Sequence, residues 1–245
     1  MDHEKLVVIP DTHGHYDQAR QLVDKLDAEG YLEERKLVFL GDYYDRGPAI
    51  RQLVDFAIEL QELGHVMLAG NHEYALLKAL EDGPDRNRWV GRWVLAYQKQ
   101  TLASYGVVPK SEWSRMDQVN ALRERMPPTH LEFLRSLPWV YQAGSLIVVH
   151  AGLDPGRSAD EQVRNLENRV EEDRWEPPQL RSRKLALPTA RIAGKCIVSG
   201  HTTYPEPYVS SERVLLDCGV DIGGPLVAWV ADSGEIISHG DARDG

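Results

Sequence analysis

The chain has 245 residues, of which 42% are hydrophobic and 27% are charged, and this composition excludes a disordered, fibrous or disulfide-stapled protein. Its 28 basic and 38 acidic residues give a net charge of −10, which disfavours nucleic acid and anionic membranes as partners. No apolar run is long enough to cross a membrane, the N-terminus is not typical of a signal peptide, and the two cysteines are expected to stay reduced, so we expect a cytoplasmic protein.

Short apolar segments typical of buried strands recur along the chain, and each is followed directly by polar residues and glycine. The first five predicted strands are Leu6–Pro10, Lys36–Leu40, His65–Ala69, Ser145–Val149 and Lys195–Ser199. Between the first three, Tyr16–Ala28 and Ile50–Leu63 carry apolar residues at helical spacing. This alternation predicts an α/β core with parallel strands, and ligands of such folds bind at the carboxyl ends of the strands.

The remaining segments predict additions to this core. From about Tyr74 to Pro138 the sequence is helical and rich in aromatic residues, which predicts a mostly helical insertion at about 75–138 that caps the sheet edge. Glu161–Arg183 predicts a charged helix and loop. Strands at Val214–Asp217, Leu226–Val230 and Glu235–Ser238 are expected to close a second sheet with mainly antiparallel pairing. We therefore predict one domain over residues 1–245 that includes the insertion.

The residues that follow the five strands are types that bind metal ions or transfer protons, together with one cationic group, Arg46. In chain order they are Asp11, His13, Asp42, Asp45, Arg46, Asn71, His72, His150 and His201. Each motif alone has an ordinary explanation: Asp11 and His13 could lie in a solvated loop, and Asp45 with Arg46 could form a surface ion pair of little energetic value.

The joint pattern favours a metal centre over these ordinary explanations. Four of the nine histidines follow apolar strands directly, and carboxylate and amide side chains occupy equivalent positions. Imidazole, carboxylate and amide-oxygen ligands together suit manganese, iron or zinc. One carboxylate shared between two such ions would give a binuclear centre with the ions about 3.5–4 Å apart.

The ordered motifs DTHG, GDYYDRG, GNHE, HAG and GHT resemble those of the calcineurin-like metallophosphoesterases. The resemblance is to the serine/threonine phosphoprotein phosphatase branch, with its bacterial and phage enzymes and the symmetrical dinucleoside tetraphosphatases, and it spans about residues 6–230. It implies an α/β (α+β) fold of two packed mixed β-sheets flanked by helices, an α/β/β/α sandwich with a helical cap.

The resemblance also implies a role for each motif residue. Asp11, His13 and Asp42 resemble the ligands of one metal ion, and Asp42, Asn71, His150 and His201 those of the other, with Asp42 bridging. Arg46 resembles the arginine that binds phosphate oxygens, His72 the general acid, and Asp45 the carboxylate that orients this acid. The implied cofactors are two divalent ions, for which we expect Mn²⁺, with Fe or Zn as alternatives.

The chain departs from the family pattern at three places. Pro10 stands where a glycine usually precedes the first motif, and a glycine pair is missing upstream of Thr101, which bears on the geometry of the cap. The family also has a second phosphate-binding arginine between the HAG and GHT motifs. Five arginines compete for this role, and we favour Arg174: Arg164, Arg169, Arg174, Arg181 and Arg183.

We predict a binuclear metal-dependent phosphatase that hydrolyses phosphomonoesters by in-line attack of a hydroxide bridging the two ions, similar to serine/threonine protein phosphatases. The alternative is symmetrical hydrolysis of dinucleoside polyphosphates such as diadenosine tetraphosphate. A third possibility is a catalytically silent, metal-stabilised binding module, but a structural metal site needs neither Arg46 nor His72. The expected partner is a phosphorylated protein or a small phosphorylated molecule.

Overall fold

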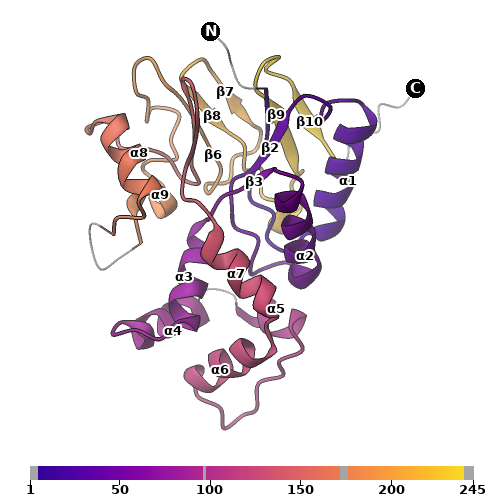
Figure 1. The fold of residues 1–245 in the computed structure, drawn as a ribbon, viewed down its shortest axis with the longest axis vertical. Helices are drawn as coiled ribbons and strands as arrows, with labels where there is room; N and C mark the ends of the chain where they lie inside the picture. Colours follow the sequence, from indigo (N-terminus) through magenta and orange to yellow (C-terminus); the bar gives the residue numbers. More distant parts are fainter. Residues whose placement is uncertain (1–4, 96–97, 172–175, 240–245) are drawn as a thin grey trace.

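The computed structural model describes residues 5–95, 98–171 and 176–239, and its strands form two five-stranded sheets (Figure 1). The first sheet has the order β10-β9-β1-β2-β3. Strands β1, β2 and β3 are parallel, whereas β9 runs antiparallel to β1 and β10 antiparallel to β9. These strands are Leu6–Ile9 (β1), Lys36–Phe39 (β2), Val66–Met67 (β3), Val227–Val230 (β9) and Ile236–Ser238 (β10).

The second sheet has the order β4-β5-β6-β8-β7 and is also mixed. Its three central strands are parallel, and each edge strand pairs antiparallel with its neighbour. The strands are Tyr141–Ala143 (β4), Leu146–Val148 (β5), Cys196–Ser199 (β6), Tyr208–Val209 (β7) and Arg213–Leu215 (β8). The expected pair of mixed sheets is therefore confirmed.

The expectation that the last three predicted strands all belong to a mainly antiparallel second sheet was wrong. Strands β9 and β10 join the first sheet, and only β8 lies in the second. All four residues of β9 are buried. A strand that is buried on both faces has no alternation of apolar and polar residues, so its sequence does not reveal which sheet it joins.

The hydrophobic core has one layer between the sheets and another under the helices. Leu6 and Val8 of β1 pack with Val148 and Val198 of the second sheet. Val7, the residue between Leu6 and Val8, points to the opposite face because side chains alternate along a strand. On that face lie α1 (Tyr16–Ala28) and α2 (Ile50–Glu62), whose buried residues recur at helical spacing. Parallel β1, β2 and β3 therefore end at one common edge.

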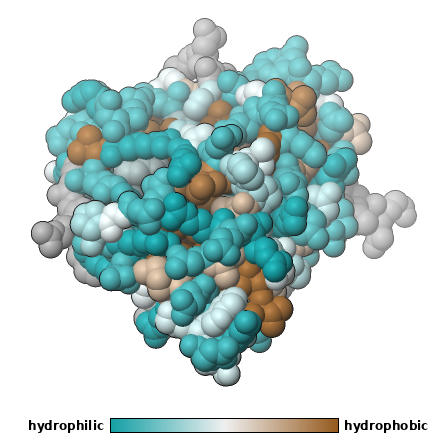
Figure 2. All heavy atoms as spheres, turned by 60° about the horizontal axis from the view of Figure 1, so that its bottom comes forward, coloured by the Kyte–Doolittle hydropathy of each residue, from teal (hydrophilic) through white to brown (hydrophobic). Residues whose placement is uncertain are grey.

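Between β3 and β4 the described residues form five helices, which lie together beyond the sheets at the lower end of Figure 1. Seen from this side, the surface is mostly hydrophilic (Figure 2). Tyr74 packs edge-to-face against Trp89 and Trp139, with ring centroids 5.3 and 5.6 Å apart. The helices are Asn71–Leu80 (α3), Arg86–Leu95 (α4), Gln98–Ser104 (α5), Arg115–Arg125 (α6) and Pro128–Ser136 (α7). Whether they form an insertion within one domain of residues 1–245 stays a prediction.

Three short helices complete the described structure. Ala159–Glu167 (α8) and Pro178–Arg181 (α9) lie between β5 and β6, and the 3₁₀ helix Val220–Ile222 (η1) lies between β8 and β9. Both cysteines are buried and free. Within residues 5–95, 98–171 and 176–239, no helix is long and apolar enough to cross a membrane.

Candidate active site

The polar motifs of five strands meet where the carboxyl ends of the two sheets come together. Asp42, which follows β2 of the first sheet, lies with its Oδ2 3.5 Å from Nε2 of His150, which follows β5 of the second sheet. Asp11, His13, Asp42 and His150 are all at most 3% exposed. The topology thus gathers residues that are more than a hundred positions apart in the chain.

The backbone of this site is strained. Five site residues other than glycine have positive φ angles: His13 (38°), Asp42 (54°), Asp45 (68°), Arg46 (66°) and His201 (67°). Each such conformation costs on the order of 1–3 kcal/mol, and residues of this kind cluster at functional sites. The rest of the fold therefore holds these side chains in place against a local energetic cost.

Two glycines allow the acidic groups to approach the loops closely. A Cβ atom on Gly70 would lie 2.0 Å from Asp42 Oδ1, and one on Gly200 would lie 2.1 Å from Asp11 Oδ1. Neither distance is compatible with a side chain. The glycines of the GNHE and GHT motifs are therefore required by the position of the carboxylates.

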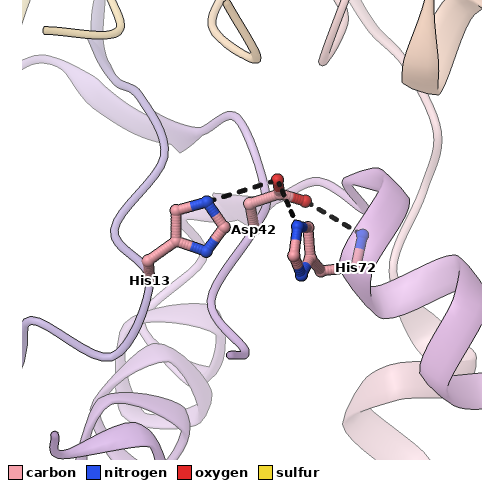
Figure 3. A group of neighbouring side chains, drawn as sticks. All are labelled: His13, Asp42 and His72. Carbon is pink, nitrogen blue, oxygen red and sulfur yellow. Dashed lines mark hydrogen bonds and ion pairs between the residues drawn. The ribbon is translucent and has the colours of Figure 1, made fainter. Parts of the chain in front are cut away.

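Asp42 lies at the centre of the site, with three imidazole rings directed at its carboxylate. Its Oδ2 is 3.6 Å from His13 Nε2, 3.8 Å from His72 Nε2 and 3.5 Å from His150 Nε2. Figure 3 shows His13 and His72 on the two sides of this carboxylate. Among the described residues, two groups of side chains are close enough to hold a metal ion, and Asp42 belongs to both: His13, Asp42 and His72, and Asp42, His150 and His201.

Backbone carbonyl groups orient two of the histidine rings, those of His13 and His150. Nδ1 of His13 lies 2.9 Å from Tyr44 O, and Nδ1 of His150 lies 2.8 Å from Leu40 O. A carbonyl can only accept, so each Nδ1 carries the hydrogen and each Nε2 can face the site with a lone pair. Nε2 of His201 is buried and has no hydrogen-bond partner among the described residues. This donor set fits a divalent ion, which would satisfy the buried imidazole nitrogen.

The charges of the site are strongly coupled. Burial opposes ionisation of Asp42, but His150 and His72 outweigh it and hold the pKa of Asp42 well below its usual value. Burial likewise opposes protonation of His150, yet Asp42 and Asp11 raise its pKa to about 10. Burial and the neighbouring His150 lower the pKa of His201 to about 3. Protons thus occupy this site when cations do not, and cation binding must displace them.

Two of the predicted ligands, Asp11 and Asn71, lie beside these groups. Asn71 Oδ1 is 3.1 Å from His150 Nε2, which adds an amide oxygen to the second group. Both carboxylate oxygens of Asp11 accept from the backbone N–H of His201, at 3.0 and 3.1 Å, and Oδ1 is 4.0 Å from His150 Nδ1. Burial, followed by Asp217, raises the pKa of Asp11 well above its usual value. Its role as a metal ligand stays a prediction.

His72 and Asp45 form the pair that the sequence predicted for proton transfer. His72 Nδ1 is 2.7 Å from Asp45 Oδ2, and Asp45 is fully buried. Trp93 Nε1 donates to Asp45 Oδ2 at 3.2 Å and Thr101 Oγ1 donates to Oδ1 at 2.5 Å. Trp93 and Thr101 come from α4 and α5, so the region interpreted as a cap also holds Asp45 in position.

Arg46 is held by an acidic residue that the sequence did not single out. Its NH1 is 2.9 Å from Oδ2 of Asp221, and its NH2 is 3.5 Å from His72 Nε2. Asp221 belongs to η1, which lies between Gly219 and Gly223, both in the left-handed region. Burial works against the charge of Arg46, but Asp42 and Asp221 raise its pKa. Arg46 therefore stays a cation next to the general-acid candidate.

Glu73 has a structural role that the motif GNHE did not reveal. Its carboxylate accepts from four backbone N–H groups, those of Asp42, Tyr43, Tyr44 and Gly70, at 2.7–3.2 Å. It also caps α3, which begins at Asn71 rather than near Tyr74 as predicted. Glu73 thus ties the loop after β2 to the first turn of α3, and no spacing rule in the sequence indicates this contact.

The structure distinguishes among the candidates for the second phosphate-binding arginine. Arg174, the favoured one, lies outside the described residues. Arg169 donates to the backbone carbonyls of three residues at the end of α7, at 2.6–2.9 Å. The backbone of Arg181 lies close enough to His201 to act on its pKa. Among the candidates that the structure describes, Arg181 is thereby placed next to the metal-binding group.

Comparisons with known proteins address the family and the fold of the chain. A protein-family model described as Calcineurin-like phosphoesterase matches residues 4–205. An asymmetrical bis(5'-nucleosyl)-tetraphosphatase from Bacillus velezensis is 26% identical over 247 residues, which cover 94% of this chain and 90% of the relative. A symmetrical bis(5'-nucleosyl)-tetraphosphatase from Aromatoleum aromaticum is 28% identical over 166 residues, 68% of this chain and 50% of the relative.

The fold is also found among solved structures. The structure of a cold-active protein-tyrosine phosphatase from a psychrophilic Shewanella species is similar with a TM-score of 0.59 at 17% sequence identity, and the match covers 96% of this chain and 80% of the other. At this identity the similarity shows a common fold alone.

Proposed function

This chain belongs to the calcineurin-like phosphoesterase family, and on that premise we propose that it hydrolyses dinucleoside polyphosphates such as diadenosine tetraphosphate, cutting them asymmetrically. That it is a metal-dependent hydrolase of phosphate esters follows from the family and its relatives. The observation that carries the substrate proposal is the extent of the similarity: the asymmetrical relatives match over about nine tenths of both chains. The symmetrical relative matches over half of its own length.

This proposal changes the order of the two substrates predicted from the sequence. The phosphoprotein phosphatase prediction rested on motifs that both branches share, and the solved protein phosphatases support the fold only. The curated relatives favour the small substrate. Mn²⁺ as the metal, two ions per site and a cytoplasmic location stay predictions.

The proposed ligands are those of the sequence prediction. Asp42 would bridge two ions, with Asp11 and His13 on one side and Asn71, His150 and His201 on the other. The ions, when bound, would lower the pKa of a coordinated water and neutralise phosphoryl oxygens. The position of Asp42 in both candidate groups supports the bridging role.

The protein residues supply the clamp and the proton. Arg46 and Arg181 would bind the oxygens of the scissile phosphate, because a guanidinium presents two parallel donors. His72 would donate the proton from Nε2 to the leaving oxygen, since Nδ1 is engaged by Asp45. Burial lowers the pKa of His72, but Asp42 and Asp45 outweigh it and raise the value to about 9 in the metal-free site.

A product analysis tests the proposal. Enzyme stripped of metal and reloaded with Mn²⁺ is incubated with diadenosine tetraphosphate, p-nitrophenyl phosphate and a serine phosphopeptide, and the nucleotides are separated by chromatography. We expect equal amounts of ATP and AMP from the dinucleotide, at a higher kcat/KM than for the phosphopeptide. ADP as the only nucleotide product would show symmetrical cleavage, and faster turnover of the phosphopeptide would restore the phosphatase prediction.

A further inference from the structure

Glu176 lies in a cluster of charged residues next to the site, and the reaction described above gives a role to Arg181 but none to Glu176 or Arg92. Its Oε2 is 2.5 Å from NH2 of Arg92 and 3.5 Å from Nε of Arg181. Two guanidinium groups therefore converge on a single carboxylate oxygen. The side chain of Glu176 is 1% exposed, whereas those of Arg92 and Arg181 are 23% and 52% exposed, so the cations border the solvent and the acid lies beneath them.

The ion pair is a poor stabiliser of the fold. Oε1 of Glu176 is buried and finds no hydrogen-bond partner within the part of the chain that the structure describes. Burial raises the pKa of Glu176 to about 7 although both arginines act to lower it, and burial lowers the pKa of Arg92 although Glu176 acts to raise it. Desolvation thus outweighs attraction for both partners, and such a pair adds little to stability.

The cluster lies next to the proposed general acid, His72. Trp93, the residue after Arg92, donates to Asp45, which in turn orients His72. The charges of His72 and Asp42 both act on the carboxyl group of Glu176. A leaving group that takes its proton from His72 would therefore lie near Glu176 and its partner Arg92.

We infer that Arg92 binds the phosphate next to the scissile one, in a polyphosphate leaving group, and that Glu176 occupies this anion site when no substrate is bound. The inference rests on the proposed function and extends it to substrate selection. A phosphate offers more charge and more acceptor oxygens than a carboxylate and can engage both guanidinium forks, so it displaces Glu176. A substrate whose leaving group has no phosphate gains nothing from this site.

The test compares the wild type with R92Q, E176Q and a control, R123Q, on two substrates. Arg123 pairs with the exposed Asp82 on the surface of the helical region and should leave both activities unchanged. For R92Q we expect kcat/KM on diadenosine tetraphosphate to fall by about tenfold more than on p-nitrophenyl phosphate, the effect of losing one charged hydrogen bond. For E176Q we expect the opposite effect: the KM for diadenosine tetraphosphate falls, because the carboxylate that competes with the substrate phosphate is gone.

A competition assay separates failure of this inference from failure of the proposed function. Tripolyphosphate and orthophosphate are used as inhibitors of p-nitrophenyl phosphate hydrolysis. R92Q should raise the inhibition constant of tripolyphosphate more than that of orthophosphate, and E176Q should lower it. Equal effects of R92Q on both inhibitors, or weaker tripolyphosphate binding in both variants, would overturn the role of Arg92.

The proposed function has its own failing outcome. If the wild type cleaves p-nitrophenyl phosphate but not diadenosine tetraphosphate, the substrate proposal fails, and the two inhibitors still decide whether Arg92 binds a second phosphate. If thermal unfolding shows that R92Q does not fold, two other variants decide instead. R92K, which keeps the charge but loses the planar fork, should raise the inhibition constant of tripolyphosphate, and E176Q should lower it.

Discussion

Replacing Glu73 with glutamine would disturb the contact that joins the loop after β2 to α3. Oε2 accepts from the N–H groups of Asp42 and Gly70 at 2.7 and 2.8 Å, and Oε1 accepts from those of Tyr43 and Tyr44 at 2.8 and 3.2 Å. Glutamine has one side-chain oxygen, so its NH₂ group would face two backbone donors. Two buried N–H groups would lose their acceptor.

The expected loss of stability is the difference between two effects. Two buried donors without an acceptor cost roughly 2–6 kcal/mol together. Against this, burial and the nearby Asp42 raise the pKa of Glu73 to about 7, from a usual value of 4.5, so its charge is itself unfavourable in the folded state. Removing that charge stabilises the folded state by up to about 3 kcal/mol at high pH. We therefore expect a net loss of about 1 kcal/mol at pH 8.

The pH dependence follows from the same shift. Because the folded pKa of Glu73 lies above the unfolded one, the wild type gains stability from this group as the pH falls from about 7 towards 4.5. Glutamine does not titrate and gains nothing. The stability deficit of E73Q should therefore be larger at pH 5.5 than at pH 8.

Urea unfolding of the metal-free proteins at both pH values measures this difference. The matched control is E81Q, at the other end of α3, where Glu81 forms an exposed ion pair with Arg135 at 2.8 Å, and it should change stability by less than about 0.5 kcal/mol. If E73Q is as stable as E81Q at both pH values, the four backbone contacts do not hold this loop and the reasoning fails.

Two further predictions concern the site itself. H72N should lower kcat by about 10²–10⁴-fold and leave the metal content, measured by atomic emission, unchanged; loss of metal would instead identify His72 as a ligand, which its place in one candidate group allows. Mn²⁺ binding near pH 8 should release protons, because Asp42 and Asp11 outweigh burial and raise the pKa of His150 to about 10, so affinity should rise with pH. Calorimetry in two buffers of different ionisation enthalpy measures this proton release. Metal binding without proton release would contradict the coupling between metal binding and protonation of His150.

The sequence predicted the parts of the site that depend on strand direction. Residues that follow parallel strands of one sheet meet at one edge, so Asp11, Asp42 and Asn71 could be placed together from the strand pattern, whereas His150 follows a strand of the second sheet. The helix Tyr16–Ala28 was also predicted with the bounds that the structure shows, because its apolar residues repeat at helical spacing. The spacing of apolar residues and the residues that follow each strand are local features, so both can be identified in a single sequence.

What the sequence could not predict depends on long-range partners. Asp221 contacts Arg46 across 175 positions, and Glu176 contacts Arg92 across 84. These acids lie in a short 3₁₀ helix and in an irregular segment, where no periodic pattern marks a buried residue. The sheet to which β9 belongs was missed for a related reason, since its residues are apolar on both faces.

The arrangement of charges explains how an acidic chain can bind a polyanion. The net charge of −10 acts at long range and is screened beyond about 8 Å at physiological ionic strength. Inside the site the acids Asp42 and Asp45 are at most 2% exposed, whereas the side chains of Arg46 and Arg181 are 32% and 52% exposed. An entering phosphate chain thus meets guanidinium groups before carboxylates. The net charge therefore acts on the association rate of the substrate, and these exposed cations act on its affinity.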